Sequence, residues 1–480
     1  MVSAFGWLFA ALAMLALLSQ PGATHDEWFH VGSIWCARGI HAPICTEVVS
    51  LGGNAKSVEY NLDALNCKLE PQDSLLCPTD HDGIGGSLSN DQLYPSGFYY
   101  VLSWFVGSSG ELSVFVTRAV SAFIVAGMLC LVMITLPSRY RLVLVLMVTT
   151  MFTSTAFYLF ASINPSSWSV LGVGVGWLPI HAALGSHKLT RSRRVALFGI
   201  GLIVSLLAAV SRWDAIPYLT VMFVLVIVHS ALTRFPGQKK IVVSISIVSP
   251  VALWAILERF TPLSPLDQVK RLTTFSAGQP DNVNFISTNI LQSFAATLRG
   301  LGTIPTMTQV DMPGAIMVGS FVSLGVFLAS SFNRRQVLQF GGLLIGVLAV
   351  GLTSAAQIAV TDSRDVGNLE PRYGLPLSAA IIGWWYLMGP KNLLARVERY
   401  LKFGGLISTV SFTLLVFTVA ERFVDKQTYT LRWLPEGPDQ WWWTWVPVGP
   451  NIPMIVAPLC FWFFMRIVTN PLRLNEEPAA

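Results

Sequence analysis

Long apolar runs separated by short polar connections dominate the chain. Twelve of these runs come close to the roughly 20 residues that a helix needs to cross the hydrocarbon core of a bilayer. They cover residues 2–20, 111–136, 142–161, 166–185, 195–210, 215–232, 241–257, 312–331, 336–358, 374–389, 403–420 and 452–468. Backbone groups in hydrocarbon must bond to one another, so each run is predicted to be a helix. The pattern predicts an all-α integral membrane protein with about 12 transmembrane helices in a single polytopic domain, residues 1–480.

The composition indicates the same class of protein. Hydrophobic residues make up 53% of the chain and charged residues only 12%, and the mean hydropathy is +0.58. A soluble domain carries about 25% charged residues, because water must wet its surface. The deficit of charge excludes an ordinary soluble protein and makes membrane lipid the expected partner of the apolar surface.

Basic residues gather in the short connections on one side of the predicted spans. Together with the C-terminal Arg466 and Arg473, that side holds more than half of the 31 lysines and arginines: Arg139, Arg141, Lys188, Arg191, Arg193, Arg194, Arg234, Lys239, Lys240, Arg334, Arg335, Lys391, Arg396, Arg399 and Lys402 are the others. Short cytoplasmic loops carry such an excess. We therefore expect a multi-pass protein of the plasma (inner) membrane with both termini cytoplasmic. The net charge of +5 follows from this asymmetry and does not indicate nucleic-acid binding.

The N-terminal run has two interpretations. Residues 1–20 lack a charged first region and are read as a retained span, although the small residues Gly22-Ala23-Thr24 are also compatible with cleavage of a signal peptide. The chain has no Asn-x-Ser/Thr sequon with a permissive middle residue, which fits a bacterial source.

The longest polar segments fall on the extracytoplasmic side. Residues 21–110 form the first large loop there and residues 258–311 the second. Within the first loop, the aromatic run 94–105 is too short to span and is suited to a juxtamembrane helix at the interface. Near the C-terminus, Trp441-Trp-Trp-Thr-Trp445 is typical of an anchor at headgroup depth.

Four cysteines lie in the first loop: Cys36, Cys45, Cys67 and Cys77. Disulfides form on an oxidising outer face, and four cysteines allow three pairings. The pairing Cys36–Cys45 with Cys67–Cys77 closes the shortest loops and is favoured. A zinc site is the alternative, but the spacing lacks a C-x-x-C pair.

Candidate chemistry begins at His25-Asp-Glu-Trp-Phe-His30, directly after the first span. If this stretch is helical, then Asp26, Glu27 and His30 share one face. A carboxylate there can deprotonate an acceptor hydroxyl, and His30 can act as a second base, a hydrogen-bond partner or a ligand. The alternative is an acidic pair that only stabilises a helix N-terminus.

Three arginines are candidates to bind a phosphate, because a guanidinium fork matches phosphate oxygens. Arg372, beside Tyr373, opens a predicted span on the outer side. The alternative role for Arg372 is that of an interfacial arginine whose side chain reaches to water. Arg212 lies at another outer boundary and is equally well explained by pairing with Asp214. Arg118 is predicted inside a span, where a charge is costly and indicates function; it reaches a phosphate or neutralises Glu111.

The glycines of the run Gly172-Val-Gly-Val-Gly176 lie inside a predicted span. There they indicate close helix packing. They do not indicate a nucleotide-binding loop, because no strand–helix context accompanies them.

Three short motifs carry a resemblance to a known family. Asp26-Glu27-x-x-His30, Ile163-Asn164-Pro165 and Pro371-Arg372-Tyr373-Gly374-Leu375-Pro376 resemble a group of bacterial multipass membrane proteins of uncharacterised function. That group is similar to the GT-C superfamily of glycosyltransferases, which includes protein O-mannosyltransferases and the lipid A aminoarabinose transferase. The resemblance extends over most of the chain by topology and over these three places by residue. Thr24-His25 stands where Pro-Pro usually precedes the acidic pair.

The resemblance implies a glycosyltransferase that moves a sugar from a polyprenyl-phosphate donor to an acceptor on the extracytoplasmic face. The acceptor would be a glycan, lipid or protein of the cell envelope. Asp26 would be the base, Glu27 its close partner or a substrate ligand, and Arg372 the group that holds the donor phosphate. No residue is assigned to a metal, and assistance by Mg²⁺ or Mn²⁺ stays open.

Two other classes of protein fit the same topology. A lipid-linked sugar flippase or other transporter suits twelve spans, but it is expected to place polar groups near the bilayer midplane. A noncatalytic scaffold for envelope assembly would not need Asp26. A transfer assay with purified protein separates the three.

Overall fold

The computed structural model describes residues 2–19, 22–23, 27–38, 45–47, 55–58, 89–90, 94–107, 109–152, 154–185, 189–234, 303–304, 310–311, 314–332, 339–346, 371–421, 443, 446 and 449–475. Helices make up nearly all of this part of the chain, which confirms the predicted helical class. The strands in it are only two to four residues long.

Six helical segments in the described residues are long and apolar enough to cross a bilayer. They are α5 (Gly110–Thr135), α8 with α9 (Ser166–Val175 and Trp177–Gly185), α10 (Arg191–Ala209), α11 (Ala215–Arg234), α18 (Leu393–Ala420) and α19 (Asn451–Val468). The pair α6 (Ser138–Thr150) and α7 (Ser154–Phe160) makes a seventh if it is counted as one bent span. The shorter apolar helices are α1 (Val2–Leu18), α15 (Gly314–Ser330) and α17 (Leu375–Leu387).

The predicted count of twelve spans is therefore not confirmed. Two physical features lower the count within the described residues: α1, α15 and α17 are shorter than a full span, and the run 142–161 is bent by 98° between α6 and α7. The predicted run 241–257 and most of the run 336–358 lie outside the described residues.

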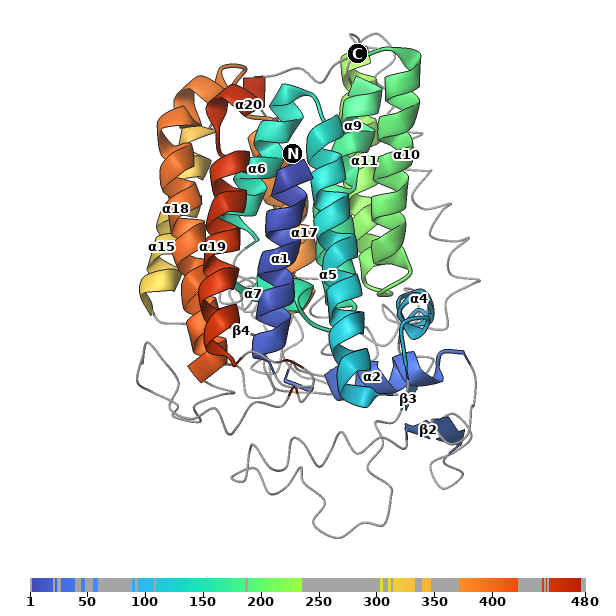
Figure 1. The fold of residues 1–480 in the computed structure, drawn as a ribbon. Coiled ribbons are helices and arrows are strands. Elements are labelled where there is room, and N and C mark those ends of the chain that lie inside the picture. Colours follow the sequence, from blue (N-terminus) through green and yellow to red (C-terminus); the bar gives the residue numbers. More distant parts are fainter. Residues whose placement is uncertain are drawn as a thin grey trace, which may run out of the picture.

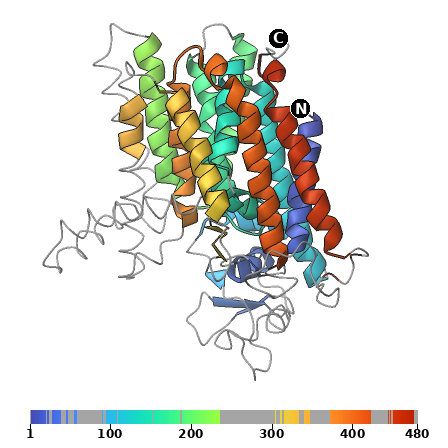
Figure 2. The same ribbon diagram turned by 90° about the vertical axis from the view of Figure 1, so that its left-hand side faces the viewer.

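The helices stand side by side and define two ends of the body (Figures 1 and 2). At one end, which we call the basic end, lie the start of α1, the short helix α20 (Pro471–Asn475) and the connections from α5 to α6, from α9 to α10 and from α17 to α18. Arg139, Arg191 and Lys391 lie in or next to these connections. The opposite end, the loop end, carries the helices α2 (Glu27–Cys36) and α4 (Gly97–Ser103). The first and last described residues of the chain thus lie at the same end of the body, and the short strands lie at the other.

Short antiparallel strands accompany the loop-end helices. Strands β1 (Cys45–Glu47), β2 (Ala55–Val58) and β3 (Ser89–Asn90) pair in that order, with Cys45 opposite Val58 and Ala55 opposite Asn90. Strands β4 (Thr303–Ile304) and β5 (Val310–Asp311) form a second ladder.

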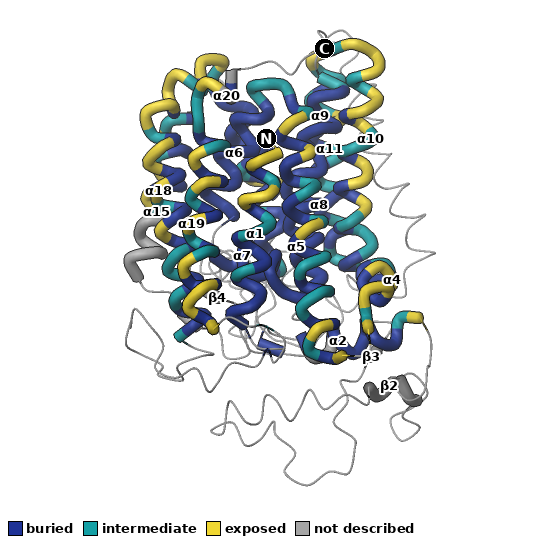
Figure 3. The backbone as a smooth tube through the Cα atoms, viewed as in Figure 1, coloured by how far each residue is buried: buried dark blue, intermediate teal, exposed yellow. Residues whose placement is uncertain are grey.

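Burial separates inner helices from outer ones. In the most apolar stretch of the span formed by α8 and α9, 89% of the residues are buried, whereas the corresponding share in α10 is 28%. Figure 3 shows α6, α8 and α9 as a mostly buried centre and exposed faces on α10, α18 and α19. Outer faces such as Leu202, Leu206 and Leu406 are apolar and exposed, which is the surface that a lipid-facing helix needs.

The glycines of α8 are explained by its contact with α10, which confirms the packing interpretation. A Cβ added at Gly172 would lie 2.5 Å from the Cβ of Ala208 and 2.6 Å from the carbonyl oxygen of Val204. A Cβ added at Gly201 of α10 would lie 2.5 Å from Cγ1 of Ile180 in α9 and 2.8 Å from the Gly176 carbonyl oxygen. Small residues on both sides let the two backbones touch.

We expect Gly172→Ala to destabilise the fold by about 1–3 kcal/mol, because the added methyl group meets backbone atoms that cannot move without separating α8 from α10. Thermal unfolding in detergent measures the effect. Gly199→Ala on α10 is the matched control, since nothing lies within 4 Å of a Cβ at that position. Equal melting temperatures for the two variants would contradict the packing argument.

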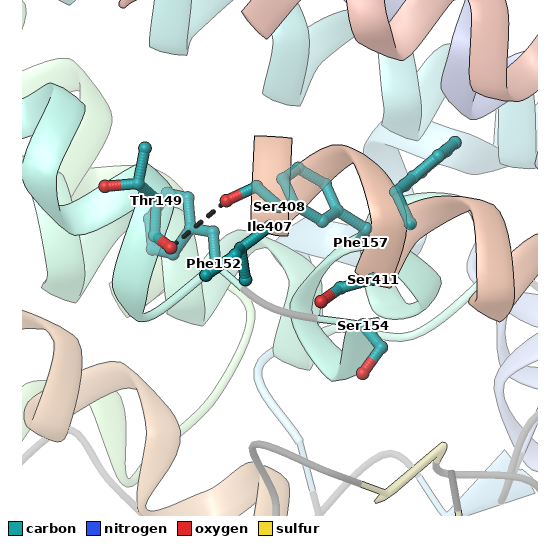
Figure 4. Close-up of a pocket in the computed structure, with 8 residues that line it drawn as sticks. Thr149, Phe152, Ser154, Phe157, Ile407, Ser408 and Ser411 are labelled. Carbon is teal, nitrogen blue, oxygen red and sulfur yellow. Dashed lines mark hydrogen bonds between the residues drawn. The ribbon is translucent and has the colours of Figure 1, made fainter. Parts of the chain in front are cut away.

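The break between α6 and α7 is stabilised from a neighbouring helix. Thr149 lies in the last turn of α6, where a carbonyl has no partner within its own helix. The Oγ of Ser408 in α18 donates to this carbonyl oxygen at 3.1 Å (Figure 4). A cavity of about 10 Å³ beside it is lined by Phe152, Ser154 and Ser411, among others, and a space of this size holds about one water molecule.

Candidate functional site

The helix α2 begins at Glu27 and brings two of the predicted residues into the protein. Glu27 and His30 are three positions apart on the same face, and both side chains are buried. The helical interpretation of this stretch is confirmed from Glu27 onward. Asp26, the predicted base, directly precedes this helix in the chain and lies outside the described residues.

Glu27 forms a buried ion pair with Arg118 of α5. Nε of Arg118 donates to Oε1 of Glu27 at 2.8 Å, and Nη2 donates to Oε2 at 2.6 Å. The backbone N–H of Ile163 also donates to Oε1, at 3.1 Å, and that of Gly22 to Oε2, at 3.0 Å. Both side chains are fully buried. The carboxylate is thus saturated by four donors from the protein itself.

Arg118 also caps the end of α1. Its Nη1 donates to the carbonyl oxygens of Ala16, at 2.9 Å, and Ser19, at 2.6 Å. The indole N–H of Trp443 donates to the Leu17 carbonyl oxygen at 2.7 Å. Helix C-termini leave such carbonyls without helical partners, so these donors satisfy them. Trp443 is buried here, so this member of the tryptophan cluster is part of the packed body and not an interfacial anchor.

These contacts favour a structural role for Glu27 and Arg118. Sequence analysis offered Glu111 or a phosphate as the partner of Arg118, and the structure pairs it with Glu27 instead. A buried charge must be paired and hydrogen-bonded to be tolerated. The pair joins α1, α2, α5 and the turn at Ile163, and so holds the first residue of α2 in place.

His30 reaches the aromatic run of the first loop. Its Nδ1 lies 2.9 Å from the Tyr99 hydroxyl, and its ring meets the Tyr94 ring edge-on with centroids 5.2 Å apart. Tyr99 belongs to α4, which is fixed to the end of α10 because the N–H of Phe98 donates to the Val210 carbonyl oxygen at 3.1 Å. His30 is therefore a buried hydrogen-bond partner within this aromatic group.

Arg212 lies between two tyrosines and is paired with Asp214. Nε and Nη2 each donate to one Asp214 oxygen at 2.8 Å, and Nη1 donates to the Ser166 Oγ at 3.0 Å. The guanidinium carbon sits 4.5 Å from the Tyr373 ring centroid and 5.6 Å from that of Tyr94. Burial alone would lower the pKa of Arg212, but the Asp214 carboxylate more than offsets it, and the pKa is raised. Arg212 therefore stays charged.

Arg372 and Tyr373 form a short 3-10 turn, Pro371–Tyr373, that leads into α17. Arg372 is almost fully buried, and its guanidinium lies 5.2 Å from the Tyr373 ring centroid. Tyr218 of α11 donates its hydroxyl to the Tyr373 carbonyl oxygen at 3.1 Å. Arg372 is thus held at the loop end beside Arg212.

Four predicted residues lie in one group that we call the arginine–tyrosine cluster: His30, Arg212, Arg372 and Tyr373, with Tyr94 between His30 and Arg212. A turn joins this cluster to the Glu27–Arg118 pair. In this turn, the backbone N–H of Ile163 donates to the Glu27 carboxylate. The N–H of Ser166 donates to Oδ1 of Asn164 at 2.9 Å, and the Ser166 hydroxyl accepts from Arg212. The cluster combines two cations with partly exposed aromatic rings, an arrangement that can bind an anionic group and the flat face of an organic ligand.

Sequence reasoning missed several members of this site. Tyr94 and Tyr99 were read as interfacial residues, and their contacts with His30 depend on α4 packing against α10. Asn164 was noticed only through the motif Ile163-Asn164-Pro165, and Ser166 was not singled out. Asp214 was found, because a carboxylate two residues from an arginine is a local signal.

The predicted disulfides are described only in part. Cys36, the last residue of α2, is disulfide-bonded. Its partner lies outside the described side chains, as do Cys67 and Cys77, so that the favoured pairing stays a prediction. Within the described residues, no group of three or more His, Cys, Asp or Glu side chains is placed to hold a metal ion.

One of three comparisons with known proteins found a match. Residues 9–381 match the family described as predicted membrane protein DUF2142. Searches of curated proteins and of solved structures found no match. The family match covers well over half of the 480 residues, and the apolar helices are consistent with a multipass membrane location. The chain therefore belongs to the DUF2142 family of predicted membrane proteins.

Proposed function

We propose that this chain is a membrane glycosyltransferase of the GT-C type. It transfers a sugar from a polyprenyl-phosphate donor to a glycan, lipid or protein acceptor of the cell envelope. The observation that carries the proposal is the arginine–tyrosine cluster beside the start of α2. Arg212, Tyr94 and the turn that carries Arg372 and Tyr373 meet there, and the turn at Ile163 links them to Glu27.

The proposed reaction is a direct displacement with inversion. Asp26 takes the proton of the acceptor hydroxyl while the oxygen bonds to C1 of the sugar. The bond between C1 and the phosphate oxygen breaks, and the polyprenyl phosphate leaves with the electron pair. Arg372 stabilises the charge on the leaving phosphate.

In this proposal, the neighbouring side chains position the base Asp26 and the phosphate ligand Arg372. Glu27 and Arg118 hold the start of α2. The guanidinium carbon of Arg212 lies 4.5 Å from the Tyr373 ring centroid and holds that ring in place. The Nε and Nη2 groups of Arg212 are occupied by Asp214. Tyr94 and Tyr373 are half-buried and offer ring faces for the sugar. A divalent ion such as Mg²⁺ or Mn²⁺ would add to the charge that holds the phosphate.

The orientation follows from charge. Arginines and lysines gather at the basic end, among them Arg191, Lys391 and Arg399, each of which is exposed. Cytoplasmic surfaces carry this excess. We therefore place the basic end, with both termini, in the cytoplasm and the cluster on the extracytoplasmic face.

A transfer assay tests the proposal. Purified protein in lipid nanodiscs is given a panel of polyprenyl-phosphate sugars, and the release of polyprenyl phosphate is measured with an acceptor extract. We expect wild type to consume one donor and Asp26→Asn to be slower by about 10²-fold, since it lacks the base. Glu398→Gln, an exposed carboxylate of α18, is the control and keeps wild-type activity.

Other outcomes assign other functions. Movement of a lipid-linked sugar across vesicles without release of the sugar would show a transporter. If cells that lack the protein have an envelope defect, and Asp26→Asn corrects it as well as wild type while no donor is consumed, the protein is a scaffold. Either result would overturn the enzyme proposal.

A further inference from the structure

A groove at the basic end is separate from the proposed active site. It lies between α18, α19 and α20 and has a volume of about 540 Å³. Figure 1 shows α20 at the end of the body opposite α2 and α4, while α18 and α19 run along the body. Its charged lining residues are Lys402, Arg466 and Glu398, so that the groove has a positive balance.

The floor of the groove is a tight helix contact. A Cβ at Gly405 would lie 3.1 Å from Cγ2 of Thr469, so α18 and α19 approach each other closely here. Thr409 and Thr469, which line the floor, are both buried. The Thr409 hydroxyl donates to the Gly405 carbonyl oxygen, and the Thr469 hydroxyl donates to the Met465 carbonyl oxygen. The two threonine hydroxyls on the floor are therefore already paired within the protein.

The two cations stand at the level where apolar spans end. Lys402 precedes the most apolar part of α18, and Arg466 is in the last turn of α19. Arg466 lies over the Trp462 ring, 4.9 Å from its centroid. Among the described ion pairs, none involves Lys402 or Arg466. Cations at this depth lie level with lipid phosphates.

Apolar residues continue the groove toward the middle of the body. Leu406 is 56% exposed and Leu459 is 52% exposed, on the outer faces of α18 and α19. Leu472 of α20 also lines the groove and is 75% exposed. The surface is thus cationic at its rim and apolar below it.

We propose that this groove binds one anionic phospholipid of the surrounding bilayer. The lipid phosphate lies between Lys402 and Arg466, and an acyl chain lies along Leu406 and Leu459. Basic pockets between membrane helices bind anionic headgroups through such complementary charge. Nothing in this assignment depends on the reaction at the loop end.

Native mass spectrometry tests the proposal. Protein is released from nanodiscs that contain equal amounts of phosphatidylglycerol and phosphatidylcholine, and the retained lipids are counted. We expect wild type to retain phosphatidylglycerol preferentially. In the double variant Lys402→Gln/Arg466→Gln, the ratio of retained phosphatidylglycerol to retained phosphatidylcholine is expected to fall by about tenfold or more, because each cation contributes separately to binding of the anionic lipid.

Two further variants make the test specific. Arg191→Gln/Lys391→Gln removes two exposed cations of the same end outside the groove and is expected to keep the preference. Leu406→Trp obstructs the apolar part without a change of charge and is expected to lower retention of the lipid. Equal retention of the two lipids by wild type, or equal losses in the two charge variants, would overturn the proposal.

Discussion

Glu27→Gln is expected to lower the free energy of unfolding by about 3–5 kcal/mol, because it leaves Arg118 as an uncompensated charge in the interior. Both side chains are fully buried, so water cannot replace the lost carboxylate. Arg118→Met is expected to cost at least as much. It leaves the Glu27 carboxylate unpaired and also removes the donors to the Ala16 and Ser19 carbonyl oxygens. Denaturant titration in detergent, followed by tryptophan fluorescence, measures both changes.

A double variant tests whether the cost belongs to the pair. Glu27→Gln with Arg118→Met removes both charges, so it is expected to lose less stability than the sum of the single variants. Glu398→Gln, an exposed carboxylate, is the control and is expected to change stability by less than about 0.5 kcal/mol. A Glu27→Gln protein with wild-type stability and no transfer activity would contradict the structural role and return Glu27 to the catalytic group.

Arg372→Gln is expected to reduce kcat/KM for sugar transfer by about 10²–10³-fold, the loss that follows removal of one group that stabilises developing charge. The buried guanidinium lies at the loop end next to Tyr373, where the proposal puts the donor phosphate. Arg372→Lys keeps the charge but loses the planar fork, so it is expected to recover the activity only in part. Release of polyprenyl phosphate measures both variants.

Arg399 offers a closely matched control. It also precedes a tyrosine, and its guanidinium lies 5.4 Å from the Tyr400 ring centroid, but it is at the basic end of α18. Arg399→Gln is expected to leave transfer unchanged. The melting temperature of each variant separates a loss of the site from a loss of the fold. Arg372→Gln protein that folds and transfers sugar at more than a third of the wild-type rate would exclude Arg372 as the phosphate ligand.

The candidate site was predictable only where its signals are local. The start of α2 near the acidic pair, the neighbouring Arg372 and Tyr373, and the pair of Arg212 with Asp214 all follow from residues close together in the chain. The partner of Arg118 does not, because Glu27 is 91 positions away. Nor does the contact of Arg212 with Tyr94 and Tyr373, which needs α4, α10 and the turn before α17 to meet.

The number of spans shows the same limit. Hydropathy located helices at the described runs, but it did not show that α6 and α7 are bent by 98° or that α17 is only 13 residues long. A break depends on whether another helix can satisfy the freed backbone groups, as Ser408 does for Thr149. That partner is supplied by a segment 259 positions away.

The amino-acid sequence by itself determined the helical class, the apolar surface and the gathering of basic residues in the connections at one end. These properties are sums over neighbouring residues, because transfer of a segment from water to lipid depends on its own composition. The tertiary structure alone decided which charges are paired and which are brought into one cluster. A buried ion is stable only where distant segments place a partner against it, and that placement depends on how the helices pack.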